Sequence, residues 1–162
     1  MKARFEELVQ ALLAACHTYY RERLVSLAVF GSVARGTMRP DSDIDILLVA
    51  KPLPRGRIPR VQEFAKVEDA LAAQFQAAKR AGIHTALSPV LKTPEETLHG
   101  SLLFLDMTDE ARILYDRDSF LRDYLQGLSA RLKALGAHRV YREGGYYWIL
   151  KPDLKPGENI VL

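Results

Sequence analysis

The sequence contains a single cysteine, no long apolar run and only a small excess of one charge. Because Cys16 has no possible partner within the chain, an internal disulfide is excluded, and we expect a protein of the reducing cytoplasm. No apolar stretch approaches the roughly 18 residues of a membrane-spanning helix, and the first residues lack a signal-peptide pattern. The 23 basic and 20 acidic residues give a net charge of +3, which does not indicate nucleic-acid binding.

Internal repeats and low-complexity segments are also absent, and 162 residues with 48% hydrophobic content fit one globular domain. We expect a single domain over 1–162, with a core over about 1–115 and a C-terminal helix, hairpin and extended tail over about 116–162. The order of elements predicts an α/β (α+β) fold, a mixed β-sheet with helices packed mainly on one side. Hydrophobic periodicity predicts helices at 3–20, 59–81, 94–105 and 120–135, strands at 24–30, 46–49 and 84–92, a short strand or extended link at 110–115, and a hairpin within 140–150.

Two aspartates stand at the head of an apolar strand, where aspartate is normally rare. Asp43 and Asp45 flank Ile44, directly before the apolar run 46–49. Because strand side chains alternate, both carboxylates share one face, with Cα atoms roughly 6.5–7 Å apart. Such a pair can hold Mg²⁺ or Mn²⁺ together with substrate phosphates, and without a cation the pKa of one carboxyl should rise. The pattern therefore predicts a divalent-metal site.

A Gly-Ser pair ends the preceding apolar run, 24–30. Gly31 allows a sharp turn and a close approach of main-chain amides to a ligand, and Ser32 adds a hydroxyl. Residues 31–36 superficially resemble a P-loop, but Thr37 stands where that motif requires lysine, and the Gly-x-Gly-x-x-Gly spacing of dinucleotide-binding proteins is absent. We therefore expect phosphate contacts at Gly31 and Ser32 that belong to neither motif.

Together these two segments resemble the signature of a known superfamily. The strings Gly31-Ser-Val-Ala-Arg-Gly36 and Asp41-Ser-Asp-Ile-Asp-Ile46 are similar to those of polymerase-β-type nucleotidyltransferases, in particular the minimal nucleotidyltransferase branch, with the strongest match over 24–50. The resemblance implies the mixed-sheet fold and transfer of a nucleoside monophosphate, AMP from ATP in the branch it resembles, to a hydroxyl on a protein or small molecule. It also implies Mg²⁺ or Mn²⁺, with two ions about 3.5–4 Å apart.

The resemblance carries over to individual positions. It implies that two carboxylates bind metal and act in catalysis and that the Gly-Ser pair contacts the triphosphate. From the residues themselves we expect that two arginines either balance phosphate charge or are solvated loop side chains. The two carboxylates are those of Asp43 and Asp45, the Gly-Ser pair is Gly31 and Ser32, and the two arginines are Arg35 and Arg39.

A third carboxylate, which the superfamily generally carries on the next strand, is missing from 84–92. Glu95 lies just beyond that strand and is the best local candidate for this catalytic role. Glu96 needs no such role, because Thr93 and Glu96 have the spacing of a helix capping box. Other acids that could reach the site from elsewhere in the fold are Asp106, Asp109, Asp153 and Glu158.

Two interpretations of function remain open. The first is an active nucleotidyltransferase, and the resemblance implies a role as antitoxin of a helical HEPN-type partner. The second is a catalytically weak or inactive nucleotide-binding module that acts by binding a partner protein. The intact Gly31-Ser32 and Asp43/Asp45 pairs favour the first, and the missing strand carboxylate favours the second.

Aromatic residues cluster in the predicted hairpin and allow two roles. Stacking on a nucleobase is one, but packing within the hairpin is the interpretation that we favour from the sequence. The residues are Tyr141, Tyr146, Tyr147 and Trp148.

Overall fold

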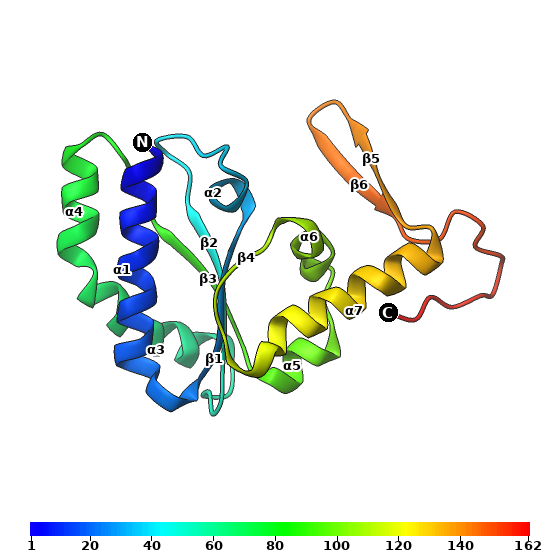
Figure 1. Cartoon of the computed structure of the whole chain (residues 1–162), viewed down its shortest axis with the longest axis horizontal. Coiled ribbons are helices and arrows are strands. Elements are labelled where there is room, and N and C mark those ends of the chain that lie inside the picture. The colour runs from blue at the N-terminus through cyan, green and yellow to red at the C-terminus, as the bar shows by residue number, and fades with distance from the viewer.

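The chain is built around a four-stranded sheet, from which a long helix and a separate two-stranded hairpin extend (Figure 1). A computed structural model describes all 162 residues. The helices are α1 (Lys2–Tyr20), α2 (Gly31–Arg35), α3 (Arg57–Ala70), α4 (Ala72–Arg80), α5 (Pro94–His99), α6 (Leu103–Glu110) and α7 (Phe120–Leu135). The strands are β1 (Leu24–Phe30), β2 (Ile44–Ala50), β3 (Leu87–Lys92), β4 (Arg112–Asp116), β5 (His138–Arg142) and β6 (Gly145–Ile149).

The sheet has the order β3-β2-β1-β4. Strand β1 runs antiparallel to both of its neighbours, whereas β2 and β3 are parallel. The mixed sheet expected from the sequence is therefore confirmed. The strand expected over 24–30 is β1, and the one expected over 46–49 is β2, which begins at Ile44 and so includes Asp45.

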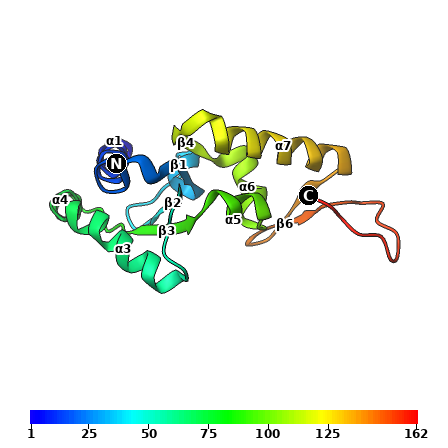
Figure 2. The ribbon, with the colours of Figure 1, turned by 90° about the horizontal axis from the view of Figure 1, so that it is seen from below.

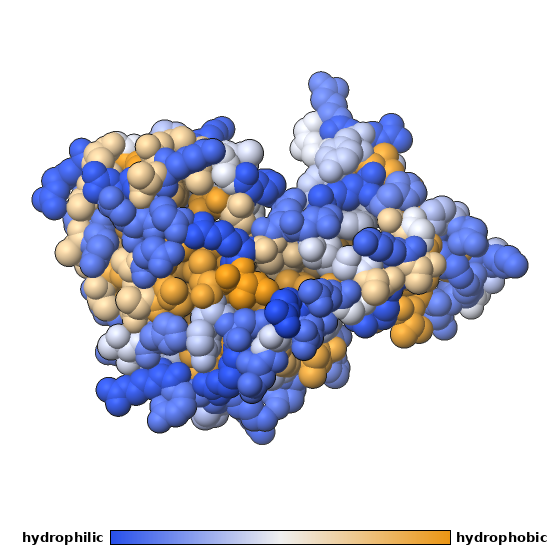
Figure 3. All heavy atoms as spheres, viewed as in Figure 1, coloured by the Kyte–Doolittle hydropathy of each residue, from blue (hydrophilic) through white to orange (hydrophobic).

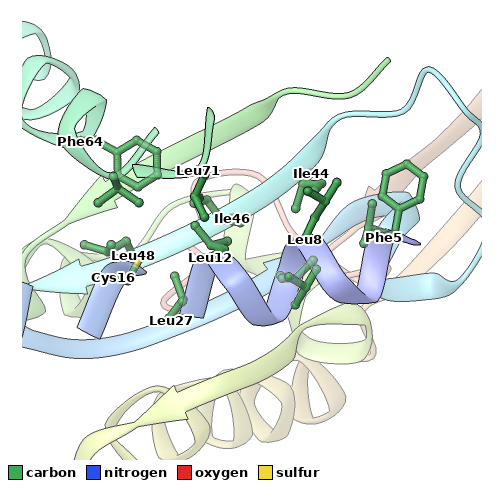
Figure 4. Close-up of a cluster of buried hydrophobic side chains, with 14 of the residues drawn as sticks. Phe5, Leu8, Leu12, Cys16, Leu27, Ile44, Ile46, Leu48, Phe64 and Leu71 are labelled. Carbon is green, nitrogen blue, oxygen red and sulfur yellow. The ribbon is translucent and has the colours of Figure 1, made fainter. Parts of the chain in front are cut away.

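Strand β2 contributes side chains to two hydrophobic cores, one on each face of the sheet. Ile44, Ile46 and Leu48 pack with α1 and α3, whereas Leu47 and Val49 pack with α6 and α7. Figure 2 shows the two groups of helices on either side of the sheet, so the second face is covered more fully than the sequence suggested. Figure 4 shows the first core, which includes Phe5, Leu8, Leu12, Cys16, Leu27, Phe64 and Leu71.

Two expected helices are each divided into two. The helix expected over 59–81 leaves helical geometry at Leu71, whose buried side chain fills the core between α3 and α4. The next helix begins as predicted: the Thr93 hydroxyl accepts from the Glu96 amide at 3.2 Å, and the Glu96 carboxylate accepts from the Thr93 amide at 3.3 Å. It ends at Gly100, whose positive φ of +89° is a backbone conformation that favours glycine, and α6 begins separately.

The C-terminal region follows the predicted order of helix, hairpin and tail. Helix α7 ends at Gly136 in a left-handed cap, as its sequence predicted. Strands β5 and β6 form an antiparallel hairpin whose last pair before the turn is Arg142 and Gly145. The chain beyond Ile149 has no regular structure. None of the helices combines the length and apolarity that crossing a bilayer requires.

One carboxylate joins the sheet to α7. The Oδ1 atom of Asp116, at the end of β4, accepts hydrogen bonds from the buried Ser26 hydroxyl at 2.7 Å and from the Leu121 amide at 2.9 Å. Its Oδ2 atom accepts from the Arg122 amide, also at 2.9 Å. Asp116 therefore pairs a buried hydroxyl and caps the first turn of α7 at once.

We predict that Asp116→Ala lowers the free energy of unfolding by about 2–4 kcal/mol, because it leaves a buried hydroxyl and helix amides unpaired. Asp116→Asn, which keeps one acceptor oxygen, should lose less. The matched control Asp123→Ala removes an exposed carboxylate in the first turn of the same helix and should cost no more than about 1 kcal/mol. Urea unfolding measures all three, and equal losses for Asp116→Ala and the control would contradict this role.

Candidate active site

Gly31 and Asp45 lie in direct contact where β1 ends and β2 begins. The register of the two strands pairs Phe30 with Asp45, so Gly31 turns away from the sheet directly over the aspartate. Gly31 has a φ of +70°, and a Cβ placed on it would collide with the Asp45 Oδ2 atom and lie 3.3 Å from its Cγ. The glycine is thus required both by the backbone conformation and by the space that the carboxylate occupies.

The short helix α2 keeps the Gly-Ser pair in place. Val33 is buried in the first core and so anchors α2 to it. Gly36 ends it in a left-handed conformation with a φ of +74°, and the Thr37 amide donates to the Ser32 carbonyl at 2.9 Å. Residues 31–36 therefore form an ordered turn that presents Ser32 beside the start of β2.

Asp41 belongs to a turn rather than to the site. The Ser42 amide donates to the Arg39 carbonyl at 3.0 Å, and the Arg39 amide donates to the Ser42 hydroxyl at 2.8 Å. The Arg39 guanidinium donates to both oxygens of Asp41, at 3.1 and 2.9 Å. Hydrogen bonding to Arg39 lowers the pKa of Asp41 and raises that of Arg39. Arg39 thus pairs with Asp41 within this exposed turn.

Asp43 and Asp45 lie near each other but in different environments. Asp43 is exposed, whereas Asp45 is half-buried. Burial is the largest cause that raises the pKa of Asp45, and the negative charge of Asp43 raises it further. The Ser88 hydroxyl and the positive charge of Arg35 act in the opposite direction. The expected rise of one pKa is confirmed, but desolvation contributes more to it than the repulsion between like charges.

Ser88 occupies the position on β3 that directly neighbours Asp45. The parallel register of β2 and β3 aligns these two residues, so Ser88 stands where a third carboxylate on the next strand would meet the pair. The structure contains no group of three or more histidine, cysteine or acidic side chains arranged to hold a metal. The site therefore offers two carboxylates and one hydroxyl.

The structure does not bring Glu95 to the aspartates, which corrects the expectation that it could serve as the third acid. Lys92, the last residue of β3, aligns with Val49 near the end of β2. Glu95 comes after Lys92 in the chain, so it lies at the end of the sheet opposite to the end that carries Asp45. Its carboxylate forms an ion pair with Lys51 instead. This ion pair lowers the pKa of Glu95.

The other acids considered from the sequence are engaged elsewhere or stand apart. Asp106 and Asp109 lie 3.6 and 3.8 Å from the Arg139 guanidinium of the hairpin. Glu158 pairs with Lys151 in the C-terminal tail, where Asp153 is also exposed.

Arg35 forms an ion pair with Glu110, a residue that the sequence did not suggest for the site. Its Nη1 atom lies 3.0 Å from Glu110 Oε2, and its charge acts on Asp45. Glu110 lies at the end of α6, far from the signature in sequence, and carried no local signal. Ser88 could have been found by aligning the expected strand 84–92 with 44–50 in parallel register.

The donor set fits a hard divalent cation. Carboxylate and hydroxyl oxygens are the ligands that Mg²⁺ and Mn²⁺ prefer, and Mg²⁺ commonly binds through one or two carboxylates together with substrate phosphates. Two carboxylates beside an open glycine turn match this description. Asp43 and Asp45 are the residues that would hold the ion.

We predict that Asp45→Asn stabilises the metal-free protein at pH 7. Because burial raises the pKa of Asp45, its ionised form lowers stability above the folded pKa, and this cost disappears below the ordinary carboxyl value of about 4. Thermal unfolding should show a higher midpoint for the variant at pH 7 and a shrinking difference towards acid pH. The control Asp153→Asn, in the exposed tail, should show no such dependence, and a lower midpoint for Asp45→Asn at pH 7 would refute the argument.

We also predict that Gly31→Ala destabilises the fold more than its backbone conformation alone explains. A left-handed alanine costs about 1–2 kcal/mol, and the collision with Asp45 should add at least about 1 kcal/mol. Gly82→Ala is the matched control, since Gly82 has a φ of +86° and a Cβ added there would have no neighbouring atom within 4 Å. In urea unfolding, Asp45→Ala should recover part of the excess loss in Gly31→Ala, and strict additivity would argue against the contact.

Comparison with known proteins identifies the family of the chain. Residues 10–101, more than half of the chain, match the family model of the nucleotidyltransferase domain. The chain is 33% identical over 130 residues to "Putative protein adenylyltransferase MJ1305" from Methanocaldococcus jannaschii, covering 79% of this chain and 83% of that protein. Among solved structures, a toxin–antitoxin with AMP-PNP is 19% identical with a TM-score of 0.48, covering 77% of this chain and 92% of that one. The toxin–antitoxin MntA-HepT is 17% identical with a TM-score of 0.40, covering 83% and 94%. This chain belongs to the nucleotidyltransferase domain family.

Proposed function

We propose that this nucleotidyltransferase transfers AMP from ATP to a hydroxyl group on a partner protein and depends on Mg²⁺. The observation that carries the proposal is the contact between the Gly31 backbone and the Asp45 carboxylate, with Asp43 beside it. That contact supports the proposal, because a turn that could bind phosphate and a pair of carboxylates that could bind metal lie within one small site. A small-molecule acceptor is the alternative for the same chemistry.

Each residue of the site has a separate task in this proposal. The Gly31 backbone and the Ser32 hydroxyl would contact the triphosphate, and Arg35 would balance part of its negative charge. Asp43 and Asp45 would hold the cation, which when bound neutralises phosphate charge and stabilises the attacking and leaving oxygens. The contact of Asp45 with Gly31 keeps that carboxylate next to the phosphate-binding turn before substrate arrives.

The reaction joins the acceptor oxygen to the α-phosphorus and breaks the bond between that phosphorus and the bridging oxygen to the β-phosphorus. Pyrophosphate leaves with the bonding electrons, and the acceptor hydroxyl releases its proton. With Ser88 beside Asp45, this chain has no additional carboxylate at the site to take that proton. Solvent or a group of the acceptor would therefore receive it.

The name of the relative from Methanocaldococcus jannaschii supports the choice of an adenylyl group and a protein acceptor. The identity of the acceptor remains part of the proposal. A helical HEPN-type protein, which the resemblance of the signature implied, stays the predicted partner.

A nucleotide-binding module without turnover is the second candidate function. The observation that favours it is Ser88, because a hydroxyl in place of a carboxylate removes one anionic metal ligand and one proton acceptor. In this alternative the chain would still bind ATP and Mg²⁺ and would act by binding its partner.

We predict that the double variant Asp43→Ala/Asp45→Ala loses Mg²⁺-dependent ATP binding by at least about tenfold and adenylyl transfer by at least about a hundredfold. Calorimetry with ATP and Mg²⁺ measures the first, and label transfer from α-labelled ATP to a co-purified partner measures the second. Asp41→Ala is the matched control, because Asp41 is a neighbouring aspartate engaged by Arg39.

The control should change binding and transfer by no more than about twofold. Metal-dependent ATP binding without transfer in the wild-type protein would favour the binding module over the enzyme. Binding that is equal in the wild-type protein and the double variant would overturn both candidates.

A further inference from the structure

The β5–β6 hairpin has two chemically different faces. Its register pairs Arg139 with Trp148 and Tyr141 with Tyr146, and directly opposed residues of an antiparallel pair project from the same face. One face therefore carries three aromatic rings and a guanidinium, whereas Tyr147 projects from the other. We refer to the first as the aromatic face of the hairpin.

The base of the aromatic face is fixed to α6. The Trp148 indole donates from Nε1 to Asp106 Oδ1 at 3.0 Å. The Arg139 guanidinium lies over the rings of Tyr146 and Trp148, 5.1 and 5.0 Å from their centroids. Its side chain is only 15% exposed, so this part of the hairpin is a packed contact and not a free arm.

Helix α6 in turn connects the hairpin to the phosphate-binding turn. Glu110 is 12% exposed and lies between two arginines, 3.0 Å from Arg35 Nη1 and 3.6 Å from Arg139 Nη2. Arg35 belongs to the same short helix as Gly31 and Ser32. A continuous chain of charged contacts thus sets the position of the aromatic face relative to the candidate active site.

Beyond this fixed base, the aromatic face is open. Tyr141 is 71% exposed and Tyr146 is 39% exposed, with ring centroids 5.7 Å apart. Trp148 therefore has the packing role favoured from the sequence, whereas Tyr141 packs on Tyr146 and leaves most of its surface exposed. Figure 3 shows a hollow between the projecting hairpin and the rest of the molecule, on the side where α2 lies in Figure 1.

We propose that Tyr141 and Tyr146 form the subsite for the nucleobase of the triphosphate. A triphosphate held at Gly31 and Ser32 would extend its nucleoside across the hollow towards these rings, and the inference rests in this respect on the proposed function. Aromatic side chains stack on any base and favour the larger surface of a purine. The guanidinium of Arg139 beneath Tyr146 adds a favourable cation–π contribution to the same platform.

The test compares a probe that carries a base with one that does not. Calorimetry in Mg²⁺ would measure the binding of AMP-PNP and of inorganic tripolyphosphate to the full chain. Tyr141→Ala should weaken AMP-PNP binding by about tenfold, the lower part of the range for one base–aromatic stack, and leave tripolyphosphate binding unchanged. Tyr141→Phe should bind AMP-PNP as the wild type does, because the ring and not the hydroxyl makes the contact.

Tyr147→Ala is the matched control, since Tyr147 is a 45% exposed tyrosine of the same hairpin on its other face; it should bind both probes normally. AMP-PNP that binds no more tightly than tripolyphosphate, or equally well to Tyr141→Ala, would overturn the inference and leave the proposed function standing. Loss of partner modification in Tyr141→Ala with unchanged AMP-PNP affinity would assign the hairpin to the acceptor instead and would also overturn it. Failure of the wild type to bind either probe would refute both proposals.

Discussion

The contact between the Gly31 backbone and the Asp45 carboxylate is the constraint on which the candidate site depends. It exists only in one register of β1 and β2, the register that pairs Phe30 with Asp45. A shift of one residue would send Asp45 to the face of Ile44 and Ile46, which is fully buried. Hydrophobic packing on both faces of β2 therefore specifies the position of a polar group at its end. The site is held by the core without any metal or substrate.

The sequence predicted the parts of the structure that local chemistry decides. The alternation of side chains predicted strand β2, a glycine predicted the end of α7, and the Thr93/Glu96 pair predicted the start of α5. Each of these predictions succeeded because its signal acts within a few residues. The helix expected over 59–81 failed at Leu71 for the opposite reason. Its side chain is buried between two helices that both pack on α1, and this tertiary preference outweighs the helical periodicity around it.

The site shows the same division between near and distant information. The proximity of Gly31 and Asp45 could be predicted from the sequence, because the two residues lie at the adjoining ends of neighbouring antiparallel strands. Placing Glu95 required knowing where β3 ends relative to β2, a register between segments about 40 residues apart that no local pattern encodes. The role of Glu110 was even harder to predict, since its contact with Arg35 arises from the packing of α6 beside α2. Acids that could have supplemented the aspartate pair are instead engaged by Arg139 and Lys51.

A site with two carboxylates has a thermodynamic consequence for the order in which ligands act. The protein offers two carboxylates and the Ser88 hydroxyl, which are fewer oxygen ligands than the octahedral geometry of Mg²⁺ requires. Triphosphate oxygens would supply the ligands that the protein lacks, since Mg²⁺ is commonly shared between carboxylates and phosphates. The cation and the nucleotide should then strengthen each other's binding by the same factor, because linkage is reciprocal. Under the proposed function, Ser88 stands where a carboxylate would add a metal ligand, and its presence would make metal binding depend on nucleotide.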